Sequence, residues 1–146
     1  MEQPLSQLRI EPWPDPVIDR LGFPPHSPYL QLWLPVVGPS VSWAWRLVAS
    51  RLEHEPDGFD LDLVETARLL GLGAGTGRNS AMWRTLQRAT RFELAQWRGE
   101  DVFAVRLRIP PLPRRHLLRL PPVAQRAHHV WMARQTRAAD AAAGVG

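Results

Sequence analysis

Apolar residues recur at helical spacing in several stretches, each bounded by proline, glycine or a capping side chain. The first stretch runs from Ser40 to Glu53, after a Pro–Ser pair that is typical of a helix start. Asp62 and Glu65 have the spacing of a capping box ahead of a second stretch that ends at Gly71. The pattern therefore predicts two helices before a glycine-rich turn.

A third helical pattern covers residues 80–92 and separates apolar from basic side chains. On a helical projection Met82 and Leu86 lie in one narrow apolar sector, and three arginines lie opposite them. Asn79 or Ser80 is a suitable cap for the first turn. This pattern predicts a helix with a buried back and a cationic front.

Residues 94–109 alternate between apolar and polar positions around a turn at Gly99, which predicts a β-hairpin. One face of this hairpin would carry Phe103, Val105, Leu107 and Ile109, and the other Arg98, Arg106 and Arg108. Residues 59–62 suggest a very short strand, whereas the apolar stretch 29–38 is too short to be classified as helix or strand.

The two ends of the chain have their own patterns. Residues 1–28 hold seven of the 15 prolines, which predicts an extended arm instead of a helix. Residues 111–137 predict short C-terminal helices, the last of them amphipathic, and residues 138–146 predict a flexible tail.

Charge is distributed unevenly along the chain. All 18 basic residues are arginine; residues 1–73 carry 5 of them with 10 acids, and residues 74–146 carry 13 with 4 acids. The net charges of the halves are therefore −5 and +9, which sum to the total of +4. A basic half indicates a polyanionic partner, most often nucleic acid, although solvated arginine faces and a GC-rich genome produce the same composition.

The motif "GLGAGTGRNS" (residues 71–80) resembles a phosphate-binding loop only in its glycine content. A P-loop requires Gly-Lys-Ser/Thr after four residues, and the chain has no lysine. The dinucleotide fingerprint fails at Thr76 when it is started from Gly71, and at Arg78 when it is started from Gly73. The remaining interpretation of residues 71–80 is a turn between two helices.

Other chemistry finds little support in the sequence. There is no cysteine, no histidine pair at zinc-binding spacing and no recognisable catalytic set, so we expect neither metal, cofactor nor enzymatic activity. No apolar run reaches membrane-spanning length, and the N-terminus lacks a signal-peptide pattern, so a cytoplasmic protein is expected, associated with the nucleoid if its basic half binds nucleic acid.

The predicted order over residues 39–110 is helix, short strand, helix, turn, helix and hairpin. This order resembles the winged helix-turn-helix class of DNA-binding domains, of the bacterial regulator type. The segment "LWLPVVGPSVSWAWRL" is also similar to the entry segment of winged helices in bacterial replication-initiation and helicase-loading proteins. The resemblance implies a mainly α chain with a small β-hairpin, whose winged helix-turn-helix domain spans residues 29–110.

What the resemblance implies for function is a transcriptional regulator that binds double-stranded DNA. Residues 80–92 would be the recognition helix and residues 94–109 the wing. The expected DNA-binding residues are Arg78, Asn79, Ser80, Arg84, Gln87, Arg88, Arg91, Arg98, Arg106 and Arg108. A homodimer is expected through Val123, Ala127, Val130 and Trp131 of the last helix.

A protein-interaction module is the alternative. Winged helices also bind proteins, as adaptors or as accessory proteins in replication or phage systems, and the arginines would then meet an acidic protein surface. Trp43 and Trp45 lie two positions apart on one helix, so both cannot face the same core. An exposed tryptophan is a candidate mark of a protein interface.

Overall fold

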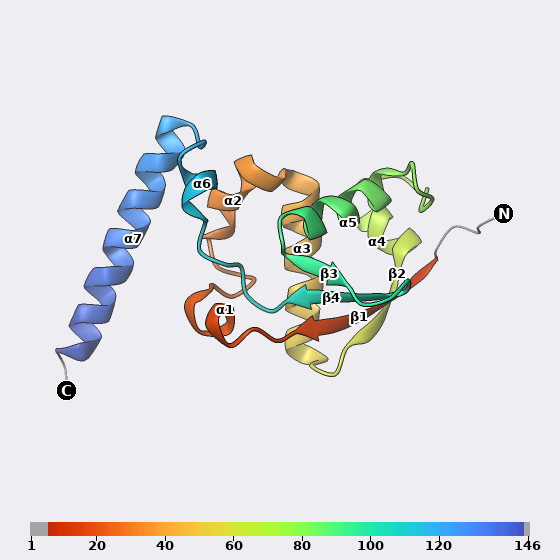
Figure 1. The fold of residues 1–146 in the computed structure, drawn as a ribbon, viewed down its shortest axis with the longest axis horizontal. Coiled ribbons are helices and arrows are strands. Elements are labelled where there is room, and N and C mark those ends of the chain that lie inside the picture. The colour runs from red at the N-terminus through yellow and green to blue at the C-terminus, as the bar shows by residue number, and fades with distance from the viewer. Residues whose placement is uncertain (1–5, 145–146) are drawn as a thin grey trace.

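A computed structural model describes residues 6–144, which form a mixed α/β fold with seven helices and one four-stranded sheet (Figure 1). The helices are α1 (Pro16–Leu21), α2 (Leu30–Val37), α3 (Pro39–His54), α4 (Leu63–Leu69), α5 (Ala81–Arg91), α6 (Arg114–Leu117) and α7 (Pro122–Ala143). The strands are β1 (Gln7–Trp13), β2 (Phe59–Asp62), β3 (Ala95–Trp97) and β4 (Val102–Arg106). The expectation of a mainly α chain with a small hairpin missed β1, which joins the other strands into one sheet.

Strand β1 lies inside the sheet, whose order is β2-β1-β4-β3. It runs antiparallel to β2 and parallel to β4, and its Ile10 lies opposite both Phe59 and Phe103. Its side chains alternate between the two faces, because Leu8 and Ile10 are buried whereas Gln7 is exposed. Strand β1 is therefore part of the core of the fold.

The expectation that residues 1–28 form an extended arm is wrong for the part that the structure describes. After β1 the chain forms α1, and Pro16 stands at its first position. The carboxylate of Asp15 caps this helix by accepting hydrogen bonds from the N–H groups of Val17 and Ile18, at 3.1 and 3.3 Å. Proline is favourable at this position, since its missing N–H group would have no partner within the helix. The proline here begins an element instead of excluding one.

The short apolar stretch before α3 is the helix α2. Its Trp33 is buried and donates its indole N–H to the carbonyl oxygen of Pro110 at 2.8 Å. Gly38 separates α2 from α3 with a φ of 87°, in the left-handed region that favours glycine. Helix α3 begins one residue before the predicted start and ends one residue after the predicted end, and β2 has its predicted bounds.

Helix α3 packs its apolar side against the sheet. Val41, Trp45 and Leu52 are buried at helical spacing, and each large apolar side chain contributes about 1.5–3 kcal/mol when buried. The indole N–H of Trp45 also donates to the carbonyl oxygen of Arg106 at 3.0 Å, which links the helix to β4. The predicted hairpin is confirmed as β3 and β4, which pair antiparallel.

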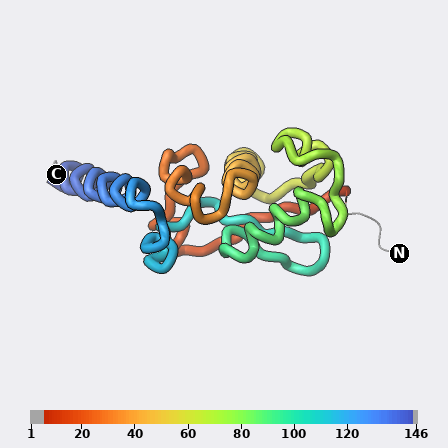
Figure 2. Tube along the Cα trace, turned by 90° about the horizontal axis from the view of Figure 1, so that it is seen from above, coloured from red at the N-terminus to blue at the C-terminus, as the bar shows by residue number. Residues whose placement is uncertain are grey.

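Helix α7 extends away from the rest of the fold (Figure 2). Its 22 residues make it about 33 Å long, and it packs on the body through the half-buried Ala124, His128 and Trp131. The expected flexible tail at residues 138–146 is corrected for residues 138–143, because the helix continues to Ala143 with its last turns exposed, and residues 145–146 lie outside the described part. Within residues 6–144, none of the helices combines the length and apolar character needed to cross a bilayer.

Candidate nucleic-acid interface

Helix α5 has the predicted buried back, and its N-terminus is capped as predicted. Met82 and Leu86 are 1% and 5% exposed. Ser80 accepts a hydrogen bond from the N–H group of Trp83 at 3.1 Å and donates its hydroxyl to the carbonyl oxygen of Gly77 at 2.6 Å. The Ser80 hydroxyl, which was expected to contact DNA, therefore caps the helix. Helix α5 therefore has a fixed position from its first turn onward.

A second anchor ties α5 to α3. The side chain of Thr85, in the second turn of α5, is buried at 4% exposure. Its hydroxyl lies 3.2 Å from the hydroxyl of Ser40 and 2.8 Å from the carbonyl oxygen of Ala81. At the wing side, the rings of Trp83 and Trp97 are 5.7 Å apart, so the helix also packs against the hairpin.

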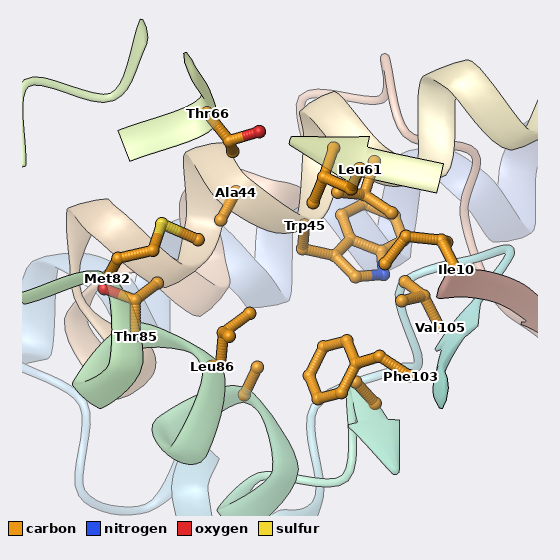
Figure 3. Close-up of a pocket in the computed structure, with 13 residues that line it drawn as sticks. Ile10, Ala44, Trp45, Leu61, Thr66, Met82, Thr85, Leu86, Phe103 and Val105 are labelled. Carbon is orange, nitrogen blue, oxygen red and sulfur yellow. The ribbon is translucent and has the colours of Figure 1, made fainter. Parts of the chain in front are cut away.

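A small cavity of about 30 Å³ lies behind α5, between α3, α4 and the sheet (Figure 3). Its wall is almost wholly apolar. Besides the Thr85 hydroxyl, the wall contains the hydroxyl of Thr66, which donates to the carbonyl oxygen of Asp62 at 2.7 Å. Because ligand sites are typically ten times larger or more, this space is a packing gap of the core and not a binding site.

The glycine-rich segment is the turn between α4 and α5. Gly71 and Gly73 have φ angles of 70° and 79°, which favour glycine. The N–H group of Leu72 donates to the carbonyl oxygen of Ala67 at 2.8 Å, which closes the C-terminal end of α4. The turn brings the exposed Arg78 and Asn79 to the start of α5.

The outward face of α5 presents arginine to solvent. Arg84 and Arg91 are exposed, whereas Gln87 is half-buried between them and the core. Arg84 donates from Nη1 to the carbonyl oxygen of Asn79 at 2.8 Å, so its guanidinium lies over the helix start. Among the described residues, the side chain of Arg91 makes no hydrogen bond or ion pair.

Arg88 differs from its two neighbours on this face. Its Nε and Nη2 atoms donate to the carbonyl oxygens of Val37 and Val36 at 2.7 and 3.1 Å. These carbonyls belong to the last turn of α2, where helical partners are missing. Arg88 therefore closes the end of α2 and ties it to α5, a role that the sequence did not reveal.

The hairpin places its arginines in three different environments. Arg98 is exposed beside the turn at Gly99, where φ is 89°. Arg108 is half-buried and donates to the carbonyl oxygen of Gly22 at 3.3 Å. The expectation that Arg106 lies on an exposed face is wrong, because its side chain is only 9% exposed.

Arg106 is held on three sides. Its guanidinium lies 3.8 Å from the ring centre of Trp13, donates from Nη1 to Asp15 at 2.9 Å and from Nε to the carbonyl oxygen of Glu93. The hydrogen bond to Arg106 is the largest cause that holds the pKa of Asp15 below its usual value. Arg106 is hidden because Trp13 pairs with it across β1 and β4, and β1 was not predicted.

An open apolar groove of about 600 Å³ lies between the start of α3 and the end of α4. It is lined by Pro39, Ser40, Trp43, Leu47, Leu69, Leu70 and Leu72. Trp43 is 59% exposed and Leu69 is 67% exposed, which is unusual for side chains of this size. The sequence indicated this surface only through the spacing of Trp43 and the buried Trp45.

The predicted dimer face of α7 is divided between two surfaces. Trp131 packs inward, with its ring 6.1 Å from that of Phe23 and 6.0 Å from that of Tyr29. Val123 and Val130 point outward and are 66% and 45% exposed. Ala127 is exposed as well, so a homodimer would use only part of the predicted face.

Comparisons with models of protein families, with curated proteins and with solved structures found no match to this chain. The functional interpretation therefore depends on the residues themselves. The described residues place exposed arginines in the turn before α5 (Arg78), on the outward face of α5 (Arg84 and Arg91) and at the hairpin (Arg98), where Glu100 and Asp101 are exposed as well.

Proposed function

We propose that this chain binds double-stranded DNA in the manner of a winged helix-turn-helix protein, as a transcriptional regulator. Helix α5 would enter the major groove and the β3–β4 hairpin would be the wing. The order α3, β2, α4, α5, β3 and β4 is the order on which the resemblance rests. The four-stranded sheet, with β1 between β2 and β4, would be an addition to that plan.

The observation that carries this proposal is the contrast between the two sides of α5. Its back is fixed by apolar contacts, capping and the Thr85 hydrogen bonds, while its front exposes Arg84 and Arg91. Arg98 adds a third exposed guanidinium at the hairpin. None of these three makes an ion pair with a carboxylate among residues 6–144, so their charge is available to phosphates.

The roles follow from position. Arg84, Gln87 and Arg91 would reach base edges, because an arginine fork matches guanine and a glutamine matches adenine. Arg78, Asn79 and Arg98 would contact phosphates on either side of the groove. Arg88, Arg106 and Arg108 would support the fold instead. Arg88 ties α5 to α2 through two hydrogen bonds, Arg106 is buried, and Arg108 is half-buried and bonded to the Gly22 carbonyl oxygen.

Fluorescence anisotropy with labelled duplex DNA across a salt series tests the proposal. The affinity of the wild-type protein should fall steeply as salt rises, and R84A/R91A should bind more weakly, by about 1–3 kcal/mol for each interaction with a base edge that the substitutions remove. R20A/R68A removes the same charge from the exposed side chains of α1 and α4 and is the matched control. Absence of wild-type binding to any duplex at low salt would refute the proposal.

One observation favours a second function, a protein-interaction module that uses the groove beside Trp43. The guanidinium of Arg46 lies 5.5 Å from the Trp43 ring centre, and the exposed Arg68 precedes Leu69. An apolar floor beside basic residues fits an amphipathic partner helix that carries acidic residues. Two results together would favour this function. The wild-type protein would bind such a partner but no duplex DNA, and the W43S variant would lose the partner.

A further inference from the structure

Helix α6 and the turn after it carry a second group of arginines, outside the surface already described. Arg114, Arg115 and Arg119 are all exposed. No hydrogen bond or ion pair of their side chains exists among the described residues. Internal contacts of the fold therefore do not account for this cluster.

The cluster lies where α5 ends. The ring of His116, in the middle of α6, is 5.4 Å from the ring of Phe92, the residue that follows α5. The same imidazole is 6.4 Å from the ring of Trp33, which fixes α6 against α2. Both views place α6 beyond the C-terminal end of α5 (Figures 1 and 2). Arg91, in the last turn of α5, and the arginines of α6 therefore follow one another along the molecule.

The charge of this region is not neutralised by nearby acids in the sequence. Residues 102–139 contain eight arginines and no aspartate or glutamate. Burial lowers the pKa of His116, and the positive charges of Arg115 and Arg119 lower it further. Arg114 and Arg115 of α6 and Arg119 in the turn after it therefore carry like charges within one short segment, a repulsion that an anionic partner would offset.

We propose that α6 is a second DNA-contacting surface, which binds the phosphate backbone beyond the groove that α5 enters; this rests on the proposed function of α5. Helix α5, placed in the major groove, is bordered by the phosphates of both strands, and residues beyond its ends lie toward that backbone. The arginines beyond its C-terminal end meet that backbone, and they extend the contacted stretch of DNA without reading its sequence.

Anisotropy titrations of R115A/R119A with a long duplex of about 24 base pairs test this inference. Affinity should fall roughly tenfold near 0.1 M salt, and the slope of log K against log salt should become shallower by about 0.9 for each phosphate that is no longer neutralised. The preference among duplex sequences should not change, since phosphate contacts carry no base information. With a duplex of about 10 base pairs, centred on the α5 site, the variant and the wild type should bind equally.

R134A/R137A is the matched control, because it removes the same charge from the exposed, projecting end of α7. This control should bind the long duplex as the wild type does. Equal losses in both variants, or an unchanged R115A/R119A, would overturn the inference while leaving the role of α5 intact. If the wild-type protein binds no duplex, the proposed function fails first, and the two failures are thereby distinguished.

Discussion

At the scale of single residues, the arginines divide by what their guanidinium groups already contact. Arg84, Arg91 and Arg98 face solvent, whereas Arg106 is enclosed by Trp13, Asp15 and the end of α5. Sequence spacing placed Arg98 and Arg106 on one face of the hairpin and treated them as equivalent. Their difference arises from β1, which pairs with β4 and places Trp13 opposite Arg106, whereas Arg98 follows β3, the strand at the edge of the sheet away from β1.

The substitution R106M tests this division. It should lower the free energy of unfolding by about 1–3 kcal/mol, because the Glu93 carbonyl oxygen and Oδ2 of Asp15 lose their hydrogen bonds from the buried guanidinium. Urea denaturation followed by circular dichroism measures the loss. The folded variant should bind DNA as the wild type does.

The exposed Arg98 provides the comparison. R98M should change the free energy of unfolding by less than about 0.5 kcal/mol, as is usual for surface positions, and should weaken DNA binding. The division would be contradicted if R106M kept the wild-type free energy of unfolding but bound DNA more weakly.

At the scale of elements, the position of α5 depends on its apolar back. Leu86 is 5% exposed and borders the small cavity behind the helix (Figure 3). L86A would enlarge that cavity and should lower the free energy of unfolding by about 2–5 kcal/mol. R91A, on the opposite face of the same helix, should change it by less than about 0.5 kcal/mol. Chemical denaturation measures the free energy of unfolding of both variants. Equal losses in L86A and R91A would show that α5 is not anchored by its apolar back.

Helix α7 is attached to the body through one side chain that titrates. Nε2 of His128 lies 2.9 Å from the Tyr29 hydroxyl oxygen, which also accepts the N–H group of Leu112 at 2.8 Å. A neutral imidazole can accept the Tyr29 hydroxyl proton in this arrangement, whereas a protonated one cannot. Burial, and to a smaller extent the neighbouring His129, lowers the pKa of His128 in the docked helix.

This arrangement predicts that acid weakens the docking of α7. Well above pH 6.5, the ordinary pKa of histidine, both docked and undocked forms carry a neutral His128, so the attachment is complete there. Below that pH the undocked form takes up a proton more readily than the docked form, and stability of the attachment is lost as pH falls.

Distances between spin labels measure this docking. The chain has no cysteine of its own, so the labels attach only at cysteines that are introduced. With labels at A139C and S50C, the distance distribution should broaden between pH 7.5 and pH 5. The H128Q variant should lose this pH dependence, whereas H116Q should retain it. An unchanged wild-type distribution at both pH values would rule out His128 as the controlling group.

At the scale of the whole molecule, local patterns predicted the elements but not how the ends of the chain join them. The pattern located α3, β2, α5 and the hairpin, because each has its own periodicity and caps. It missed β1, whose strand partners lie about 50 and 90 residues further along the chain. Long-range pairing leaves no local signal, and the prolines near β1 suggested an arm.

The same limit applies to the candidate site. The outward-facing positions of Arg84 and Arg91 follow from helical periodicity and were predicted. The tethering of Arg88 to α2 and the burial of Arg106 depend on elements distant in sequence, so no local pattern reveals them. The α6 cluster was visible as charge, but its place at the end of α5 required the contact between Phe92 and His116.

The central claim is that the outward face of α5, with the turn before it and the hairpin tip, meets duplex DNA. Titration of ¹⁵N-labelled protein with duplex DNA tests this most directly, because each backbone amide reports its own surroundings. We predict the largest shifts at residues 78–91 and 98–101, with small shifts around the Trp43 groove. Shifts confined to that groove, or no shifts at low salt, would contradict the claim.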